Sequence, residues 1–132
     1  MTERPPALPT LPPVPTLNRI RLESIAREVS AEFLDELVLL FVTDVAKKLD
    51  LLTDAVRERR MQAALQSTHA LKGSAASLGV SRLRELAARL EEHLRRNDWR
   101  AAETMHVRLL REFAYVRRVF GHAPAHDSDP EI

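Results

Sequence analysis

The chain is organised around one central stretch, Thr68-His69-Ala70-Leu71-Lys72-Gly73-Ser74-Ala75-Ala76-Ser77-Leu78-Gly79. Its apolar residues recur every three or four positions, which predicts a helix with one buried face over about residues 61–78. A helix turns by about 100° per residue, so His69 should point nearly opposite that face. Lys72 lies one turn further on, and the other residues around the histidine are small. A reactive side chain on a bare, rigid surface indicates chemistry with another macromolecule rather than with a buried small molecule.

Four other segments carry the periodicity of amphipathic helices, and most of them are bounded by a recognisable cap or stop. Ser30, Ser81 and Asp98 are the expected N-caps, and Gly79 and Gly121 are the expected C-terminal stops. The expected helices lie at about residues 18–28, 31–58, 82–96 and 99–120.

The connections between the four long helices are short, so successive helices must run antiparallel. We therefore expect an all-α fold, an antiparallel up-down-up-down four-helix bundle with a short extra N-terminal helix as a lid. The composition agrees, because only three glycines and 5% aromatic residues argue against a β fold. The positions expected to face inward are Leu34, Leu37, Val38, Phe41, Val45, Leu49, Leu52, Val56, Met61, Ala64, Thr68, Leu71, Ala75, Leu78, Leu83, Leu86, Ala87, Leu90, Leu94, Ala102, Met105, His106, Leu109, Phe113, Val116 and Phe120.

Length, charge and cysteine content narrow the class of protein. A chain of 132 residues suffices for one domain with a real core, and its net charge of +1 creates no field that would attract nucleic acid or an anionic membrane. The absence of cysteine excludes disulfides and thiolate metal sites. The longest apolar run, residues 37–42, is too short to span a membrane, and the N-terminus resembles no signal peptide. We therefore expect a monomeric cytoplasmic domain that binds no nucleic acid and makes no direct membrane contact.

The two ends of the chain differ in composition from the part between them. Residues 1–16 are rich in proline, which favours an extended linker or a disordered tail. Residues 122–132 are polar, so we expect a flexible C-terminal tail. His122 and His126 are spaced like metal ligands, but the proline between them opposes a shared helix, and we expect no metal site. The helical domain itself should cover residues 17–121.

His69 must be weighed against the ordinary alternative, a surface histidine with no role. Gly73 argues for a role, because a glycine inside a helix costs about 1 kcal/mol relative to alanine and needs a reason such as the close approach of another body. Lys72 could reach an anion attached to the ring. No large side chain shades the ring on its C-terminal side, and an exposed imidazole is mostly neutral at cytosolic pH and can act as a nucleophile.

The block from His69 to Gly79 closely resembles the signature of histidine-containing phosphotransfer (HPt) domains. The resemblance covers about residues 17–120, although only the central block is specific. The pattern of the following helix also matches, through Leu83, Leu86 and Leu90.

The resemblance implies a role for each matching residue. His69 would accept a phosphoryl group, Lys72 would stabilise the phosphoryl oxygens, and Gly73 would leave room for the partner's active-site loops. Ala76 and Leu65 would belong to the same docking surface.

The resemblance also implies the function. His69 would receive the phosphoryl group from a receiver-domain aspartate and pass it to an aspartate of a response regulator, in a phosphorelay of two-component signalling. The chain would have no kinase activity and no cofactor of its own, because Mg²⁺ and the aspartate would belong to the receiver. The proline-rich start favours the C-terminal module of a hybrid sensor histidine kinase, tethered through that parent to the inner membrane. A free-standing phosphotransfer protein is the alternative.

Two residues of the next helix are candidates for supporting the site. Some members of the family place a glutamine, with an arginine one turn later, near the level of the histidine, and Glu91 and Arg95 stand there in this chain. The charge of Glu91 would oppose a phosphoryl group unless Arg95 paired with it. An ordinary surface ion pair between residues four positions apart is the other interpretation.

A rival interpretation keeps the bundle but removes the chemistry. In it, the domain is a helical docking or dimerisation module that binds a receiver or another signalling partner and carries no phosphate. A kinase-type dimerisation bundle fits less well, since it would use one helical hairpin per chain and would be expected to have His-Glu in place of His69-Ala70. A docking module should bind its partner whether or not His69 is intact.

Overall fold

The computed structural model describes residues 17–121, and this part of the chain contains five helices and no strand. The predicted linker 1–16, the predicted tail 122–132 and the pair His122 and His126 lie outside the described residues. Every expected helix is present, with ends within two residues of the expected ones. The helices are α1 (Arg19–Glu28), α2 (Ala31–Arg57), α3 (Met61–Leu78), α4 (Ser81–Arg95) and α5 (Trp99–Phe120).

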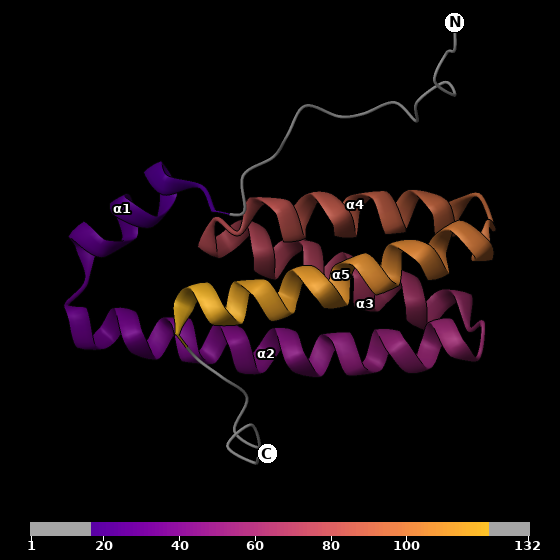
Figure 1. Ribbon diagram of the computed structural model, residues 1–132, viewed down its shortest axis with the longest axis horizontal. Coiled ribbons are helices and arrows are strands. Elements are labelled where there is room, and N and C mark those ends of the chain that lie inside the picture. The colour runs from indigo at the N-terminus through magenta and orange to yellow at the C-terminus, as the bar shows by residue number, and fades with distance from the viewer. Residues whose placement is uncertain (1–16, 122–132) are drawn as a thin grey trace, which may run out of the picture.

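The four long helices form an antiparallel up-down-up-down bundle, as predicted (Figure 1). In this bundle α3 packs between α2 and α4, and α5 closes the bundle between α4 and α2. The short helix α1 lies at one end, beside the first turns of α2 (Figure 1). None of the helices in the described part of the chain is long and apolar enough to cross a membrane.

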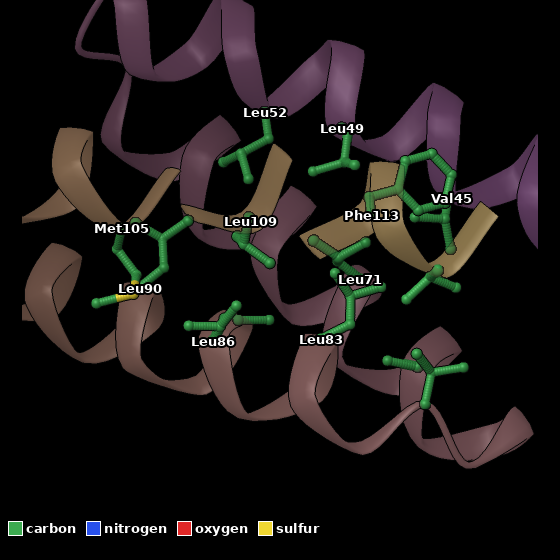
Figure 2. Close-up of a cluster of buried hydrophobic side chains, with 14 of the residues drawn as sticks. Val45, Leu49, Leu52, Leu71, Leu83, Leu86, Leu90, Met105, Leu109 and Phe113 are labelled. Atoms are coloured by element: carbon green, nitrogen blue, oxygen red, sulfur yellow. The ribbon is translucent and has the colours of Figure 1, made fainter. Parts of the chain in front are cut away.

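All four long helices contribute to one hydrophobic core (Figure 2). On α3 the core residue Leu71 is fully buried, as are Leu83 and Leu90 on α4 (Figure 2). Replacing a leucine of this kind by alanine costs about 2–5 kcal/mol, so the core holds α3 in one rotational setting. The opposite side of α3 must therefore face outward. Of the predicted inward positions, only those near the helix ends are half-buried: Leu34, Leu37, Met61 and Phe120.

Helix α1 fastens the end of α3. Gly79 adopts the left-handed conformation with φ of 77°, as predicted for the stop, and its carbonyl oxygen accepts a hydrogen bond from the Asn18 amide at 2.6 Å. The Arg21 guanidinium donates to the Ser77 carbonyl oxygen through Nε at 3.1 Å and Nη2 at 3.0 Å. A Cβ atom at Gly79 would lie 2.8 Å from Cγ of Arg21. The end of α3 is thus held by a segment far away in sequence.

Two of the three predicted N-caps are confirmed, and one is wrong. Ser30 Oγ accepts from the Phe33 amide, and Asp98 Oδ1 accepts from the Ala101 amide, each at 3.1 Å. Ser81 is instead the first residue of α4, and Val80 occupies the cap position without a side-chain hydrogen bond. The reason is the burial of the Val80 side chain, which is fully enclosed by the core and holds the chain before it enters the helix.

Candidate functional site

His69 lies on the outward face of α3, and 72% of its side chain is exposed. Its neighbour Thr68 is fully buried and donates a hydrogen bond to the Ala64 carbonyl oxygen at 2.7 Å. Leu71, two residues after His69, is also fully buried in the core. The ring is therefore presented by a helix whose opposite face is fixed by packing. This confirms the predicted placement of the histidine on the outward face of the helix.

The helix surface beyond His69 is bare, as the small residues predict. Gly73 and Ala76 are both exposed. A Cβ atom added to Gly73 would meet nothing within 4 Å, so packing inside this chain does not require a glycine there. The residue also weakens the helix relative to alanine, so neither packing nor helix propensity within residues 17–121 favours a glycine at this position.

Glu91 on α4 faces the ring of His69. It is only 6% exposed, and its carboxylate reaches across to α3. Lys72 Nζ donates to Oε1 at 2.7 Å, Arg95 Nη2 donates to Oε2 at 2.9 Å, and His69 Nδ1 lies 3.4 Å from Oε2. The hydrogen bond from Lys72, followed by that from Arg95, outweighs burial and lowers the pKa of Glu91 to about 2. The carboxylate is therefore ionised at neutral pH.

This cluster settles the geometry that the sequence left open for Glu91 and Arg95. Their ion pair exists, but it is not an ordinary surface pair, because Glu91 is buried and also binds Lys72 on the neighbouring helix. The side chain of Lys72 is 29% exposed, and its ammonium donates one hydrogen bond to Glu91. The lysine is thus held at the level of the ring instead of extending freely into solvent.

A shallow groove between α3 and α4 runs past the ring, and it brings His69 together with Leu65, one of the residues expected on the docking surface. Gly73 and Ala76 are not part of the groove, since they lie on the other side of the ring along α3. Gln66 and Ala70 were not predicted, although their positions three residues before and one residue after the histidine could have indicated them. The lining residues are Leu65, Gln66, His69, Ala70, Glu91 and Arg95.

The α2 side of α3 carries a second polar contact. Asp44 accepts hydrogen bonds from Lys48 of its own helix, as the spacing of four residues predicts, and from Ser74 of α3 at 3.0 Å. The bond from Lys48 holds the pKa of Asp44 below its usual value.

Within residues 17–121, no three histidine or carboxylate side chains are grouped closely enough to hold a metal ion. The charged groups beside the His69 ring are thus the carboxylate of Glu91 and the two cations that contact it, Lys72 and Arg95.

Comparison with known proteins identifies the family. The sequence profile of the Hpt domain matches residues 36–118. The chain is 28% identical over 82 residues to the phosphorelay protein LuxU of Vibrio vulnificus. The aligned segment covers 62% of this chain and 71% of that relative. It also resembles the crystal structure of histidine-containing phosphotransfer protein B (HptB) from Pseudomonas aeruginosa, with a TM-score of 0.75 and 31% identity over 81% of this chain and 92% of that one.

A phosphotransfer protein from rice, described as putative, shares the fold at a TM-score of 0.74 but only 16% identity, over 80% of this chain and 77% of that one. The bundle and the family profile together define the class: a phosphocarrier of two-component signalling that relays phosphoryl groups between receiver domains and is not itself a kinase. The chain belongs to the Hpt domain family.

Proposed function

We propose that His69 is the residue that carries the phosphoryl group, taking it from the aspartate of one receiver domain and passing it to the aspartate of a response regulator. The observation that supports this most is the exposure of the ring, 72%, on the outward face of a packed helix inside the matched segment 36–118. A receiver can approach such a ring without any rearrangement of the bundle.

Lys72 and the small residues have distinct roles in this proposal. Lys72 stabilises the phosphoryl oxygens, since an ammonium held at the level of the ring can add a charge-assisted hydrogen bond to them. Gly73 and Ala76 on one side of the ring, and Leu65 on the other, form the surface on which the receiver docks. The empty space over Gly73 supports this, because that space is open to a partner's loop.

The receiver supplies the remaining chemistry. Phosphoryl transfer is mainly positioning and neutralisation of charge, and Mg²⁺ bound to the receiver would provide most of that neutralisation. The chain itself contributes the nucleophilic ring, one cation and an unobstructed approach. We expect the domain, residues 17–121, to work as a monomer in the cytoplasm.

The sequence predicts two possible settings for the domain, a free-standing protein and the C-terminal module of a hybrid sensor histidine kinase. The names of the LuxU and HptB relatives describe phosphorelay and phosphotransfer proteins, which supports a free-standing protein and gives no support to a place at the end of a hybrid sensor kinase. An immunoblot of the native protein distinguishes the two. A band near the 15.0 kDa of this chain supports the free-standing form, and a much larger band supports the hybrid kinase.

The experiment that tests the role of His69 is phosphotransfer from a panel of phosphorylated receiver domains. Wild-type protein should acquire an acid-labile, base-stable label, and His69→Gln should acquire none. His93→Gln is the matched control, because His93 lies half-buried on α4 and should not affect labelling. Full labelling of His69→Gln would refute the assignment. Receiver binding without any labelling of the wild type would instead support the docking module that carries no phosphate.

A further inference from the structure

The side of the bundle formed by α2 and α5 lies opposite the side formed by α3 and α4, which carries the groove past His69 (Figure 1). Large apolar side chains are uncovered there. Val107 and Leu110 on α5 are 44% and 39% exposed, and Leu39 on α2 is 51% exposed. The function proposed above uses none of them. Exposed apolar side chains that gather on one side of a small domain mark a contact with another protein.

A contact between Thr53 and His106 fixes the register of α2 against α5, because Oγ1 of the threonine lies 2.8 Å from Nε2 of the histidine. Asp50 precedes Thr53 by one turn, and Leu110 follows His106 by one turn. Since the two helices run antiparallel, Asp50 and Leu110 lie at the same level of the bundle. Arg111 follows Leu110 directly. Asp50 and Arg111 are both exposed, and neither forms an ion pair with any other residue in the described range 17–121.

One turn beyond the same contact, in the other direction, the signs of the charges are reversed. Arg57 on α2 and Glu103 on α5 are level with each other there, and both are exposed. Arg57 lies 3.9 Å from Asp54, and Glu103 lies 3.1 Å from Arg59. The seam between α2 and α5 therefore has one anion and one cation at each of two levels, on opposite helices.

A surface with this pattern is complementary to a second copy of itself. A two-fold rotation about an axis along the seam, parallel to the helices, places α5 of one copy against α2 of the other at the same level. Asp50 then faces Arg111 of the second copy, and Arg57 faces its Glu103. An axis perpendicular to the helices at the level of Leu110 would instead bring Asp50 against Asp50 and Arg111 against Arg111, and like charges oppose that arrangement. The charges therefore select the parallel axis.

The side chains along the middle of the seam allow two copies to approach closely. Ala46 on α2 and Ala114 on α5 are small and half-buried, and they lie between the larger apolar residues. Leu39, Ala46 and Thr53 share one side of α2 because they are spaced by seven residues. An apolar centre with a charged rim is the usual composition of an interface between proteins.

We propose that the α2–α5 side is an interface between two copies of this chain, related by a two-fold axis parallel to the helices. The inference goes beyond the function proposed above and does not rest on it. Each copy keeps a complete transfer site, so a single copy is sufficient for transfer. The apolar centre is small and the rim is charged, so the pair is weak and forms as the concentration rises. The two His69 rings of a pair face in opposite directions, and each is open to a receiver.

Sedimentation equilibrium of the full chain between about 10 and about 500 µM tests the proposal. At low salt the average mass of the wild type should rise from the 15.0 kDa of one chain toward twice that value. Asp50→Arg and Arg111→Asp should each weaken association by about tenfold or more, because like charges then face each other. An equal mixture of these two variants should associate again, since each new charge meets an opposite one. Glu92→Arg, the same change of charge on the exposed surface of α4, is the matched control and should associate like the wild type.

Salt provides a test that needs no variant. Raising it to about 1 M should weaken association of the wild type, because exposed charges are then screened. A wild-type mass of one chain at every concentration would overturn the proposal, and so would growth beyond two chains. Association that persists unchanged in both charge variants would exclude this interface, and a mixture that stays monomeric would exclude the two-fold arrangement.

Circular dichroism verifies that the variants are folded, as the exposure of both substituted side chains predicts. The measurement contains no receiver and no phosphate. Failure of the wild type to be labelled at His69 would therefore contradict only the proposed function.

Discussion

Lys72 and Glu91 join α3 to α4 directly beside the proposed phosphoacceptor, through a hydrogen bond of 2.7 Å between Nζ and Oε1. The two residues lie 19 positions apart, and one partner is buried while the other is partly open to solvent. The contact therefore serves the packing of the helices and the electrostatics of the ring at the same time, and the two contributions can be measured separately.

A double-mutant cycle on this pair should reveal strong coupling. Lys72→Ala leaves the buried carboxylate with Arg95 as its main cation and should lower the free energy of unfolding by about 1–3 kcal/mol. In a Glu91→Leu background the same change should cost much less, since no charge is then left unpaired. Equilibrium urea unfolding measures all four proteins. Arg96→Ala on the exposed pair should change stability by less than about 0.5 kcal/mol, and equal costs at Lys72 in both backgrounds would contradict the coupling.

The pH dependence of stability should carry the signature of Glu91. Its pKa is about 2 in the folded protein against an ordinary value of 4.5, so the unfolded chain binds the proton more readily. The stability that the carboxylate contributes is fully present above about pH 4.5 and is lost as the pH falls toward 2, and it amounts to a few kcal/mol at most. Unfolding of Glu91→Gln should show a shallower loss over this range. Parallel pH profiles for the two proteins would argue against the ion-pair cluster.

His106 on α5 predicts a pH effect in a different range. Its ring is 9% exposed, and Nε2 lies 2.8 Å from Oγ1 of Thr53 on α2. Burial first, and then the nearby charge of Arg57, lowers the pKa of His106 below its ordinary value of 6.5. The unfolded chain therefore takes up the proton at a higher pH than the folded one, and stability should be full above about 6.5 and decline below it. The decline between pH 7 and 5 should be smaller in His106→Gln, as thermal unfolding would show.

Two glycines should respond to alanine in opposite directions. Gly73→Ala should raise the free energy of unfolding by up to about 1 kcal/mol, because a Cβ atom there has nothing within 4 Å and the helix gains propensity. Gly79→Ala should lower it by about 1–2 kcal/mol, since φ is 77° and the new atom would press against Arg21. Urea unfolding measures both. Destabilisation by Gly73→Ala would show that this glycine has a packing role within the domain.

A larger residue at the first of these positions tests docking rather than folding. Gly73→Leu should remain folded, because its side chain extends into open space, yet it should slow phosphotransfer at least tenfold by occupying the surface proposed for the receiver. Leu51→Ala is a useful control, as it changes an exposed apolar residue on α2. Normal transfer to Gly73→Leu would place the docking surface elsewhere.

Helix periodicity was sufficient to predict the bundle, because each long helix has one apolar face and each connection is short. It also placed His69 correctly, since a residue's direction on a helix follows from its distance in sequence from core residues such as Leu71. The left-handed turn at Gly79 was predictable for a similar local reason, namely that glycine adopts positive φ without strain.

Features that depend on two helices at once were not predictable. Nothing in the spacing of α4 indicates that Glu91 is buried, because that depends on how far α4 is shifted and rotated against α3. The entry into α4 was misassigned at Ser81 because the fit of Val80 into the core, a tertiary contact, decides it. Between α2 and α3, Arg59 adopts φ of 55° where a glycine would be expected, so sequence offered no marker of that turn.

The single exposed ring on one face of α3 also limits how partners can share the domain. As the proposed phosphoacceptor, the ring of His69 cannot be reached by two receivers at once, so donor and acceptor should exclude each other and transfer should follow ping-pong kinetics. An excess of unphosphorylated acceptor would then slow loading of the carrier by occupying it unproductively. Flow through such a relay is greatest at an intermediate acceptor concentration, which makes the ratio of the two receivers in the cell a control on the signal.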